Sequence, residues 1–240
     1  MNLMTPSVIW IFIPTLLSLV LVAVHRLRKL SVWITCVGSL LLAVAAFIFP
    51  QSLEFSLGGR LFLFDDTAQI FNRSLILTGS QLRTVAVMFS ITCLWNIAAY
   101  RFPVSRWFPT VSLSITALWV STLAVGTFLY SAVIVELIVL VSVLLLTPRG
   151  EQAGSGEMRY LVSQTVAMPF ILLSGWMVTG IESAPSANTL ILRGTVMILI
   201  GFSLWLAVFP LHSWMPMLAE KTHPWVFSFV FLMHQTILTF

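Results

Sequence analysis

A single carboxylic acid interrupts a long apolar stretch of the sequence. Glu136 lies between Ser131 and Ser142, and all the other residues of that interval are Ala, Val, Ile or Leu. A charged side chain at the centre of a bilayer costs about 2.5–3.5 kcal/mol or more, so it persists by pairing, by facing water or by holding a proton. We therefore predict that Glu136 is a proton-relay residue. The alternative is a structural polar contact between helices.

Two histidines could act with this acid, because histidine exchanges protons near neutral pH. His234 lies inside an apolar run, and we predict that it is a second relay group; the alternative is a neutral histidine bonded to a neighbouring helix. His212 follows Pro210, and we predict that it lines a polar pocket there; the alternative is an interfacial histidine beside Trp214. A haem held by the two histidines is a weaker hypothesis.

Pro210 lies where the seventh apolar run gives way to polar residues. Proline removes a backbone donor and bends or ends a helix. In a membrane, such a break persists only where protein or water satisfies the backbone, and broken helices often form ion sites. We predict a helix break at Pro210. The alternative, that Pro210 only ends a helix at the interface, is equally compatible with the sequence.

Motifs of other chemistries are absent from the sequence. It contains no nucleophile elbow, phosphate-binding loop, dinucleotide fingerprint or zinc-ligand spacing. We therefore expect no catalytic residue, no metal and no cofactor. Cys36 and Cys93 lie in apolar runs, and we interpret them as small buried side chains. The 12 Lys and Arg residues are scattered, so no nucleic-acid partner is expected.

The composition indicates that Glu136 and the histidines belong to a protein embedded in a lipid bilayer. Of 240 residues, 59% are hydrophobic and 8% are charged, and the mean hydropathy is +1.02. These values exclude a soluble globular domain and a disordered tail. We predict an all-α polytopic membrane protein with about eight transmembrane helices, one of them broken. The predicted spans are Ser7–Val24, Leu30–Phe49, Thr84–Tyr100, two within Trp107–Pro148 divided near Gly126-Thr127, Leu161–Thr179, Gly194 to about Pro210, and Trp225–Phe240.

The basic residues between the spans predict the orientation, because cytoplasmic loops carry more Lys and Arg. With the N-terminus outside the cytoplasm, eight basic residues are cytoplasmic and four are not. The first group is Arg26, Arg28, Lys29, Arg101, Arg106, Arg149, Arg159 and Lys221; the second is Arg60, Arg73, Arg83 and Arg193. We therefore expect a multi-pass protein of the cell (inner) membrane with a non-cytoplasmic N-terminus.

One loop has an internal pattern. Residues 52–57 alternate between polar and apolar types, residues 60–64 alternate as Arg-Leu-Phe-Leu-Phe, and Gly58-Gly59 separates the two runs. This pattern predicts a small β-hairpin at the outer membrane face. Asp65 and Asp66 follow it, and we interpret them as part of a connector without chemistry.

Three segments carry a resemblance to a known family. Phe209–Pro216, FPLHSWMP, resembles the His-x-Trp-x-Pro signature of the antiporter-like subunits of respiratory complex I, multisubunit cation/proton antiporters and membrane-bound hydrogenases. Val135-Glu136-Leu137 resembles the Trp-Glu-Leu segment with the buried glutamate of that family. Residues 57–66 look like its outer-loop segment. The resemblance extends over most of the chain, and the His-x-Trp-x-Pro motif is its sharpest part.

The resemblance implies roles for the same residues. In that family a buried glutamate pairs with a lysine of the broken seventh helix, and a lysine or histidine of the eighth helix carries charge onward. This implies that Glu136 is the glutamate and His212 the motif histidine, and that His234, or Gln235, is the eighth-helix base. The implied function is a membrane subunit of a proton-translocating complex, whose partners are other membrane subunits. The complex could be a quinone oxidoreductase or hydrogenase in which this chain is not catalytic, a cation/proton antiporter, or a proton-coupled system for inorganic-carbon uptake.

The chain also departs from the family pattern. Trp205 occupies the position of the lysine, and Met217-Leu218 replaces Asp-Ala after the motif. We divide the chain into a three-helix segment with the hairpin, residues 1–106, and a first five-helix repeat, residues 107–240. The family has a second such repeat, so we expect a partner chain to supply it. The alternative is a degenerate subunit that anchors partners and moves no ions.

Overall fold

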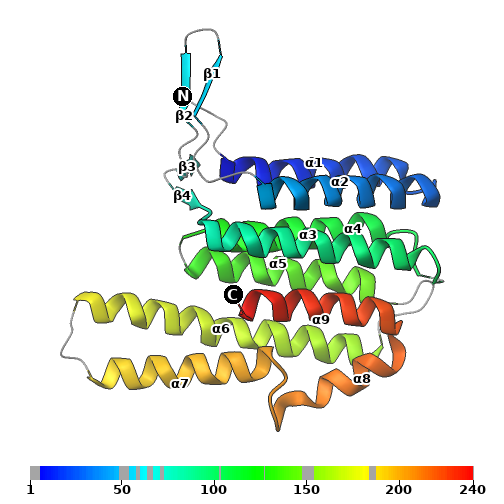
Figure 1. Ribbon diagram of the computed structural model, residues 1–240. Helices are drawn as coiled ribbons and strands as arrows, with labels where there is room; N and C mark the ends of the chain where they lie inside the picture. The colour runs from blue at the N-terminus through cyan, green and yellow to red at the C-terminus, as the bar shows by residue number, and fades with distance from the viewer. Residues whose placement is uncertain are drawn as a thin grey trace. The chain divides into compact units, whose positions relative to one another are not determined.

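A computed structural model describes residues 6–48, 54–57, 60–63, 67–70, 73–102, 104–126, 128–147, 154–183 and 188–239 of the chain. Over these ranges the protein is almost entirely helical (Figure 1). The helices are α1 (Pro6–Val24), α2 (Arg28–Ile48), α3 (Gly79–Ala99), α4 (Phe108–Ala124), α5 (Phe128–Leu146), α6 (Ser155–Ser183), α7 (Asn188–Trp205), the short 3₁₀ helix η1 (Leu211–Ser213), α8 (Trp214–Lys221) and α9 (Pro224–Thr239).

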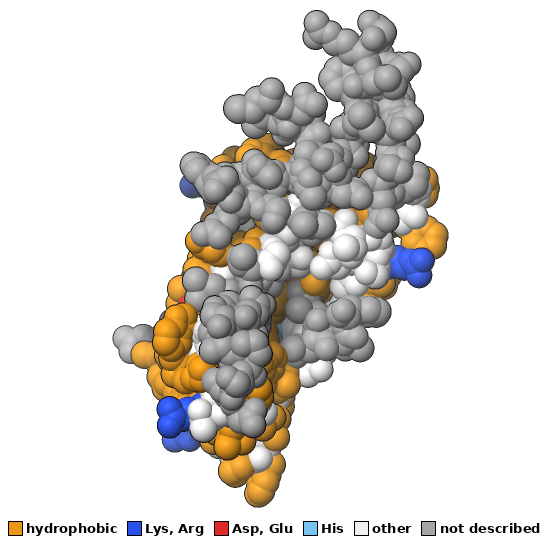
Figure 2. Space-filling model, turned by 90° about the vertical axis from the view of Figure 1, so that its left-hand side faces the viewer, with side chains coloured by type: hydrophobic (Ala, Val, Ile, Leu, Met, Phe, Trp, Pro, Cys, Tyr) orange, Lys and Arg blue, Asp and Glu red, His pale blue; other side chains and the backbone are white. Residues whose placement is uncertain are grey.

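Within the described ranges, three helices are long and apolar enough to cross a membrane. They are α2, α3 and the Ser155–Met177 part of α6. Shorter apolar helices cover Val8–Val24, Phe108–Ala124, Tyr130–Leu146 and Thr189–Trp205. Large apolar side chains are exposed along the helices, and Figure 2 shows hydrophobic side chains over much of the described surface in view. Because such a surface is unfavourable in water, the fold is that of a membrane protein.

The predicted spans and the observed helices differ mainly at their ends. α4 and α5 lie on either side of the predicted division at Gly126-Thr127. α6 begins at Ser155, six residues before the predicted start at Leu161. The start of α6 contains Glu157 and Arg159. A span predicted from a run of uncharged residues therefore omits this part of the helix, although its backbone is helical.

Two antiparallel strand pairs lie between α2 and α3 in the sequence. β1 (Glu54–Leu57) pairs with β2 (Arg60–Leu63) in the register Glu54↔Leu63 to Leu57↔Arg60. β3 (Thr67–Ile70) pairs with β4 (Arg73–Ile76), a second hairpin that the sequence pattern does not predict. Thr-Ala-Gln-Ile alternates over only four residues, and Arg-Ser-Leu-Ile does not alternate. The glycine pair of the predicted turn and the two aspartates Asp65 and Asp66 lie outside the described residues.

The chain forms two compact units. Unit 1 consists of Met1–Gly126 and Ser228–Phe240, and unit 2 of Thr127–Phe227. In unit 1, α2 packs on α3 and α1 packs on α4. Buried polar side chains join α3 to α4: the Thr92 and Thr116 hydroxyls lie 2.7 Å apart, and Asn96 Nδ2 donates to Ser112 Oγ at 3.0 Å. Such bonds stabilise helix pairs in a membrane by about 0.6 kcal/mol each.

In unit 2, α6 is the central helix and packs on α5, α7 and α8. Glycines allow two of these contacts to be close. A Cβ on Gly201 of α7 would lie 2.7 Å from Ile171 Cγ1 of α6. A Cβ on Gly156 of α6 would lie 2.5 Å from the Met217 carbonyl oxygen of α8. Small residues at such crossings let helix backbones approach each other in membranes.

The C-terminal end of α7 is a hydrogen-bonded cap, and it lies before Pro210. The amide of Val208 donates to the Ser203 carbonyl at 2.9 Å and the amide of Ala207 to the Leu204 carbonyl at 3.4 Å. Ala207 has a φ of 54°, so these bonds form a Schellman motif with alanine in the left-handed position. The helix therefore breaks at residues 206–210, and α7 ends five residues earlier than the predicted limit of the seventh span at Pro210.

The alanine in this cap predicts a stabilising substitution. A residue with a Cβ in the left-handed region costs about 1–2 kcal/mol, and glycine avoids this cost but loses more freedom on folding. We expect Ala207→Gly to raise the free energy of unfolding by up to about 1 kcal/mol. Thermal unfolding of the purified protein in detergent checks this, and Ala219→Gly, in the exposed part of α8, is the control that should be destabilised. A fall in stability for Ala207→Gly contradicts the assignment of the cap.

Candidate proton-relay site

The predicted acid Glu136 lies on α5 and faces α6. Its Oε1 accepts a hydrogen bond of 2.8 Å from the Thr165 hydroxyl of α6. Its Oε2 is buried and has no hydrogen-bond partner among the described residues. Glu136 also lies within electrostatic range of the Tyr160 hydroxyl. The carboxyl is thus held by one bond and retains one oxygen that can take up a proton.

Thr165 behaves differently from most hydroxyl residues of these helices. Thr35, Ser142 and others donate to the carbonyl one turn earlier in their own helix. Thr165 instead donates across the helix interface to the carboxylate. Pro169 lies four residues later, inside α6, and has no amide hydrogen to donate to the Thr165 carbonyl. Thr165 therefore provides both a hydroxyl bonded to the carboxylate and a carbonyl released from the helical pattern.

The broken end of α7 is satisfied by a side chain of α6. Gln164 Nε2 donates to the Trp205 carbonyl oxygen at 3.1 Å. The last carbonyls of a helix lack partners in their own helix, and in a membrane they need one from elsewhere. Trp205 is buried, and it occupies the position at which the family resemblance places a lysine. Gln164 therefore caps the break, and Trp205 brings no positive charge to it.

His212 and Pro210 lie at the surface of unit 2. Pro210 precedes η1, and His212 is exposed within it. The His212 ring has its centroid 5.6 Å from that of Phe209. His212 is thus open to its surroundings, whereas Glu136 is half-buried.

His234 lies in unit 1, on α9. It is 7% exposed, and its ring meets the edge of Trp119 with the centroids 4.9 Å apart at 85°. The ring also bonds to the backbone carbonyl of Val230, one turn earlier. Glu136 and His212 belong to unit 2, so the structure describes His234 in separate surroundings.

Three residues of this site were missed or given little weight in the sequence: Glu157, Tyr160 and Thr165. Glu157, Tyr160 and Gln164 are spaced by three and four positions, which places them on one face of a helix. That spacing was a readable signal. The predicted sixth span begins at Leu161, so the prediction leaves Glu157 and Tyr160 in a loop and does not place them on the helix. Thr165 had no local signal, because its partner is 29 residues away.

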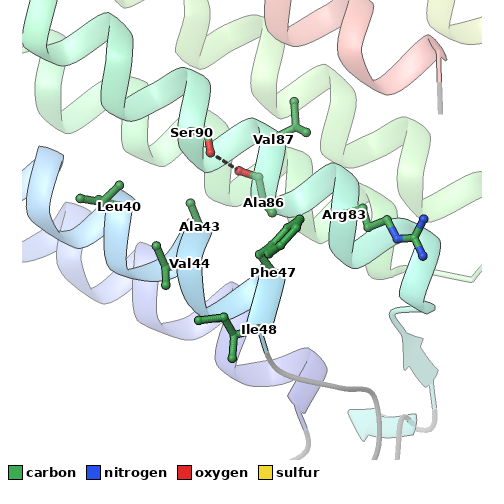
Figure 3. Close-up of a pocket in the computed structure, with 9 residues that line it drawn as sticks. All are labelled: Leu40, Ala43, Val44, Phe47, Ile48, Arg83, Ala86, Val87 and Ser90. Atoms are coloured by element: carbon green, nitrogen blue, oxygen red, sulfur yellow. Dashed lines mark hydrogen bonds between the residues drawn. The ribbon is translucent and has the colours of Figure 1, made fainter.

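Other candidate sites in the described part of the chain lack relay chemistry. No three residues of the His, Cys, Asp and Glu types gather there as metal ligands. Cys36 and Cys93 are buried free thiols, which confirms their interpretation as small buried side chains. A groove of about 460 Å³ lies between α2 and α3. Figure 3 shows apolar side chains such as Phe47 along it. Its polar side chains are Arg83 and Ser90, and the Ser90 hydroxyl already donates to the Ala86 carbonyl at 2.8 Å.

Comparison with known proteins gives no family for the chain: no protein-family model and no curated protein sequence matches it. The function therefore has to be argued from the site.

Proposed function

We propose that this chain is a membrane subunit of a multisubunit proton-translocating complex, in which it provides or completes a proton path. The observation that carries the proposal is the Glu136 carboxyl. It lies between two apolar helices, with one oxygen bonded to Thr165 and the other buried without a hydrogen-bond partner in the described part of the chain. A carboxyl in such surroundings is a functional site by default. Its free oxygen accepts a proton, and the same O–H bond breaks when the proton passes to water or to a base.

The wider arrangement belongs to the same proposal. The chain has about eight spans with the N-terminus outside the cytoplasm of the cell (inner) membrane, and it belongs with the antiporter-like subunits. His234 is a second relay group, and His212 and Pro210 lie at the break of the seventh span. Because Trp205 brings no charge to Glu136, the charge that drives the transfer comes from a partner subunit. A partner that supplies a second five-helix repeat fits this role.

One observation favours a second function. The family resemblance places a lysine where the structure has a buried tryptophan, and an uncharged residue there suits a subunit that only anchors its partners. The transport function predicts that ion flux depends on this chain, whereas the anchoring function predicts that it does not. Both functions require the chain to be bound by other membrane subunits, so assembly does not distinguish them.

The test starts from the complex as it exists in the cell. The chain is tagged, the complex is purified in mild detergent, and its other membrane polypeptides are identified by mass spectrometry. The complex is then reconstituted into vesicles, and proton movement is followed with a pH-sensitive dye. We expect flux that is lost in complexes prepared without this chain but containing the remaining subunits. Undiminished flux in those complexes contradicts the transport function.

The role of His234 can be tested separately from its packing. Phenylalanine preserves an aromatic ring of similar size against Trp119 but cannot bind a proton. We expect His234→Phe to leave assembly intact and to lower proton flux by about tenfold or more, in keeping with the 10²–10⁴-fold contributions of proton-transfer groups. Met233→Leu, a volume-conserving exchange at the neighbouring buried position of α9, is the matched control and should retain flux. Full flux in His234→Phe assigns this histidine to packing alone.

A further inference from the structure

A row of polar side chains runs along the buried face of α6. Glu157, Tyr160 and Gln164 follow one another at helical spacing, and each is only 1% exposed. Seven residues of helix separate the first from the last, which corresponds to about 10 Å along the axis. The row lies within unit 2, where α6 contacts α5, α7 and α8. Such side chains are rarely buried without hydrogen-bond partners.

Four oxygen atoms of this row have no hydrogen-bond partner among the described residues. They are both carboxylate oxygens of Glu157, the Tyr160 hydroxyl and Oε1 of Gln164, and all of them are buried. Leaving a buried acceptor without a donor costs about 1–3 kcal/mol, and more if the group is charged. Internal water commonly meets this need, since a buried water makes about three hydrogen bonds to such groups. The row therefore has the chemistry of a hydrated passage.

The Glu157 end of the row opens toward solvent beside Lys221. Gly154 precedes α6, and a Cβ there would lie 2.8 Å from Glu157 Oε2 and 3.3 Å from Lys221 Nζ. The acid and the ammonium thus face one small space, which Gly154 leaves free of a side chain. Lys221 is exposed, whereas Glu157 is not. A proton reaching this space from solvent meets a buried carboxyl directly.

The other end of the row reaches the proposed relay site. Tyr160 lies beside Ser142 of α5 and within electrostatic range of Glu136. Gln164 is adjacent in sequence to Thr165, whose hydroxyl holds Glu136, and its amide group caps the broken end of α7. The buried row thus connects the buried acid beside the exposed Lys221 with the acid of the relay site.

We propose that Glu157, Tyr160 and Gln164 form a water-filled proton-uptake path to Glu136, with Glu157 as its first acceptor. This inference rests on the proposed function and adds the side from which the proton comes. Glu157 takes a proton from solvent at the Lys221 end and forms an O–H bond. That bond breaks as the proton passes to a water of the row, and the last water donates to Glu136. Glu157 is left as a carboxylate that faces the same small space as Lys221.

The presence of water is tested without measuring transport. Glu157→Cys and Gln164→Cys are treated with a small, membrane-impermeant, thiol-specific reagent, which reacts with the thiolate and therefore needs water at the thiol. Met168→Cys, one turn further along α6 and also buried, is the matched control; the unchanged protein sets the background from Cys36 and Cys93. We expect labelling at positions 157 and 164 at least about tenfold faster than at 168. Equal, slow labelling at all three positions shows a dry row and overturns the inference.

The role of Glu157 in uptake is tested in the assembled, reconstituted complex. We expect Glu157→Gln to lower proton flux by tenfold or more, while Glu220→Gln, on the exposed face of α8, leaves it unchanged. Unchanged flux in Glu157→Gln, together with loss of flux in Glu136→Gln, overturns the uptake path but leaves the proposed function intact; Glu157 is then a buried acid with no part in proton uptake. Unchanged flux in both variants overturns the proposed function and the uptake path together. If Glu157→Gln fails to assemble, Gly154→Ala provides a second test, because the added methyl group fills the space between the Glu157 carboxyl and the Lys221 ammonium. We expect Gly154→Ala to slow proton uptake, and full flux in this variant overturns the path.

Discussion

Replacing Glu136 by glutamine is expected to abolish proton flux through the assembled complex, by about 10²-fold or more given the usual contribution of a proton-transfer group. The exchange isolates the chemistry from the packing. Glutamine has the same shape, and its amide oxygen can still accept the hydrogen bond from the Thr165 hydroxyl. The amide, however, cannot bind and release a proton at the buried Oε2 position.

Three controls make the Glu136 result interpretable. Co-purification of the other subunits shows that the variant assembles. Glu220→Gln removes an exposed carboxyl and should retain full flux. Thr165→Val removes the hydroxyl that holds the carboxylate, and we expect a partial loss of flux, because the acid remains but is less well positioned. Normal assembly with normal flux in Glu136→Gln rules out a relay role for this residue.

Replacing Gly156 by alanine is expected to separate α8 from α6. The added Cβ would lie 2.5 Å from the Met217 carbonyl oxygen, 2.8 Å from its carbon and 2.9 Å from Leu218 Cα. All three are backbone atoms, so no side chain can rotate away and α8 itself has to move. Overpacking of this kind costs about 1–3 kcal/mol. We expect a lower unfolding temperature in detergent and less assembled complex in the membrane.

The chain offers a matched control for the Gly156 substitution. Gly194 of α7 is also a buried helical glycine, but a Cβ there would lie 3.6 Å from Met177 Cβ, an ordinary contact. Because alanine favours a helix over glycine by about 1 kcal/mol, Gly194→Ala should be neutral or stabilising. If both variants behave alike, the close crossing of α6 and α8 is not what constrains position 156.

Local patterns predicted the predominantly helical fold. Long apolar runs that lack charges have one stable backbone form in lipid, so the helices could be predicted from composition. The prediction failed at helix ends with charges, as at Glu157 in the first turn of α6. An acid is favourable there because it lies near the positive end of the helix dipole. A hydropathy pattern does not take this interaction into account.

The position of Glu136 in an apolar run was likewise apparent from the sequence, because the cost of a carboxyl in lipid depends only on the residue and its surroundings in the chain. What surrounds the carboxyl was decided by the tertiary structure. The Thr165 hydroxyl, the Gln164 amide at the Trp205 carbonyl and the close crossing at Gly156 all join segments far apart in the sequence. The exposure of His212 and the contact of His234 with Trp119 likewise depend on which helices pack together. The sequence pattern predicts which face of a helix is polar. Which other helix packs against that face is determined only by the tertiary structure.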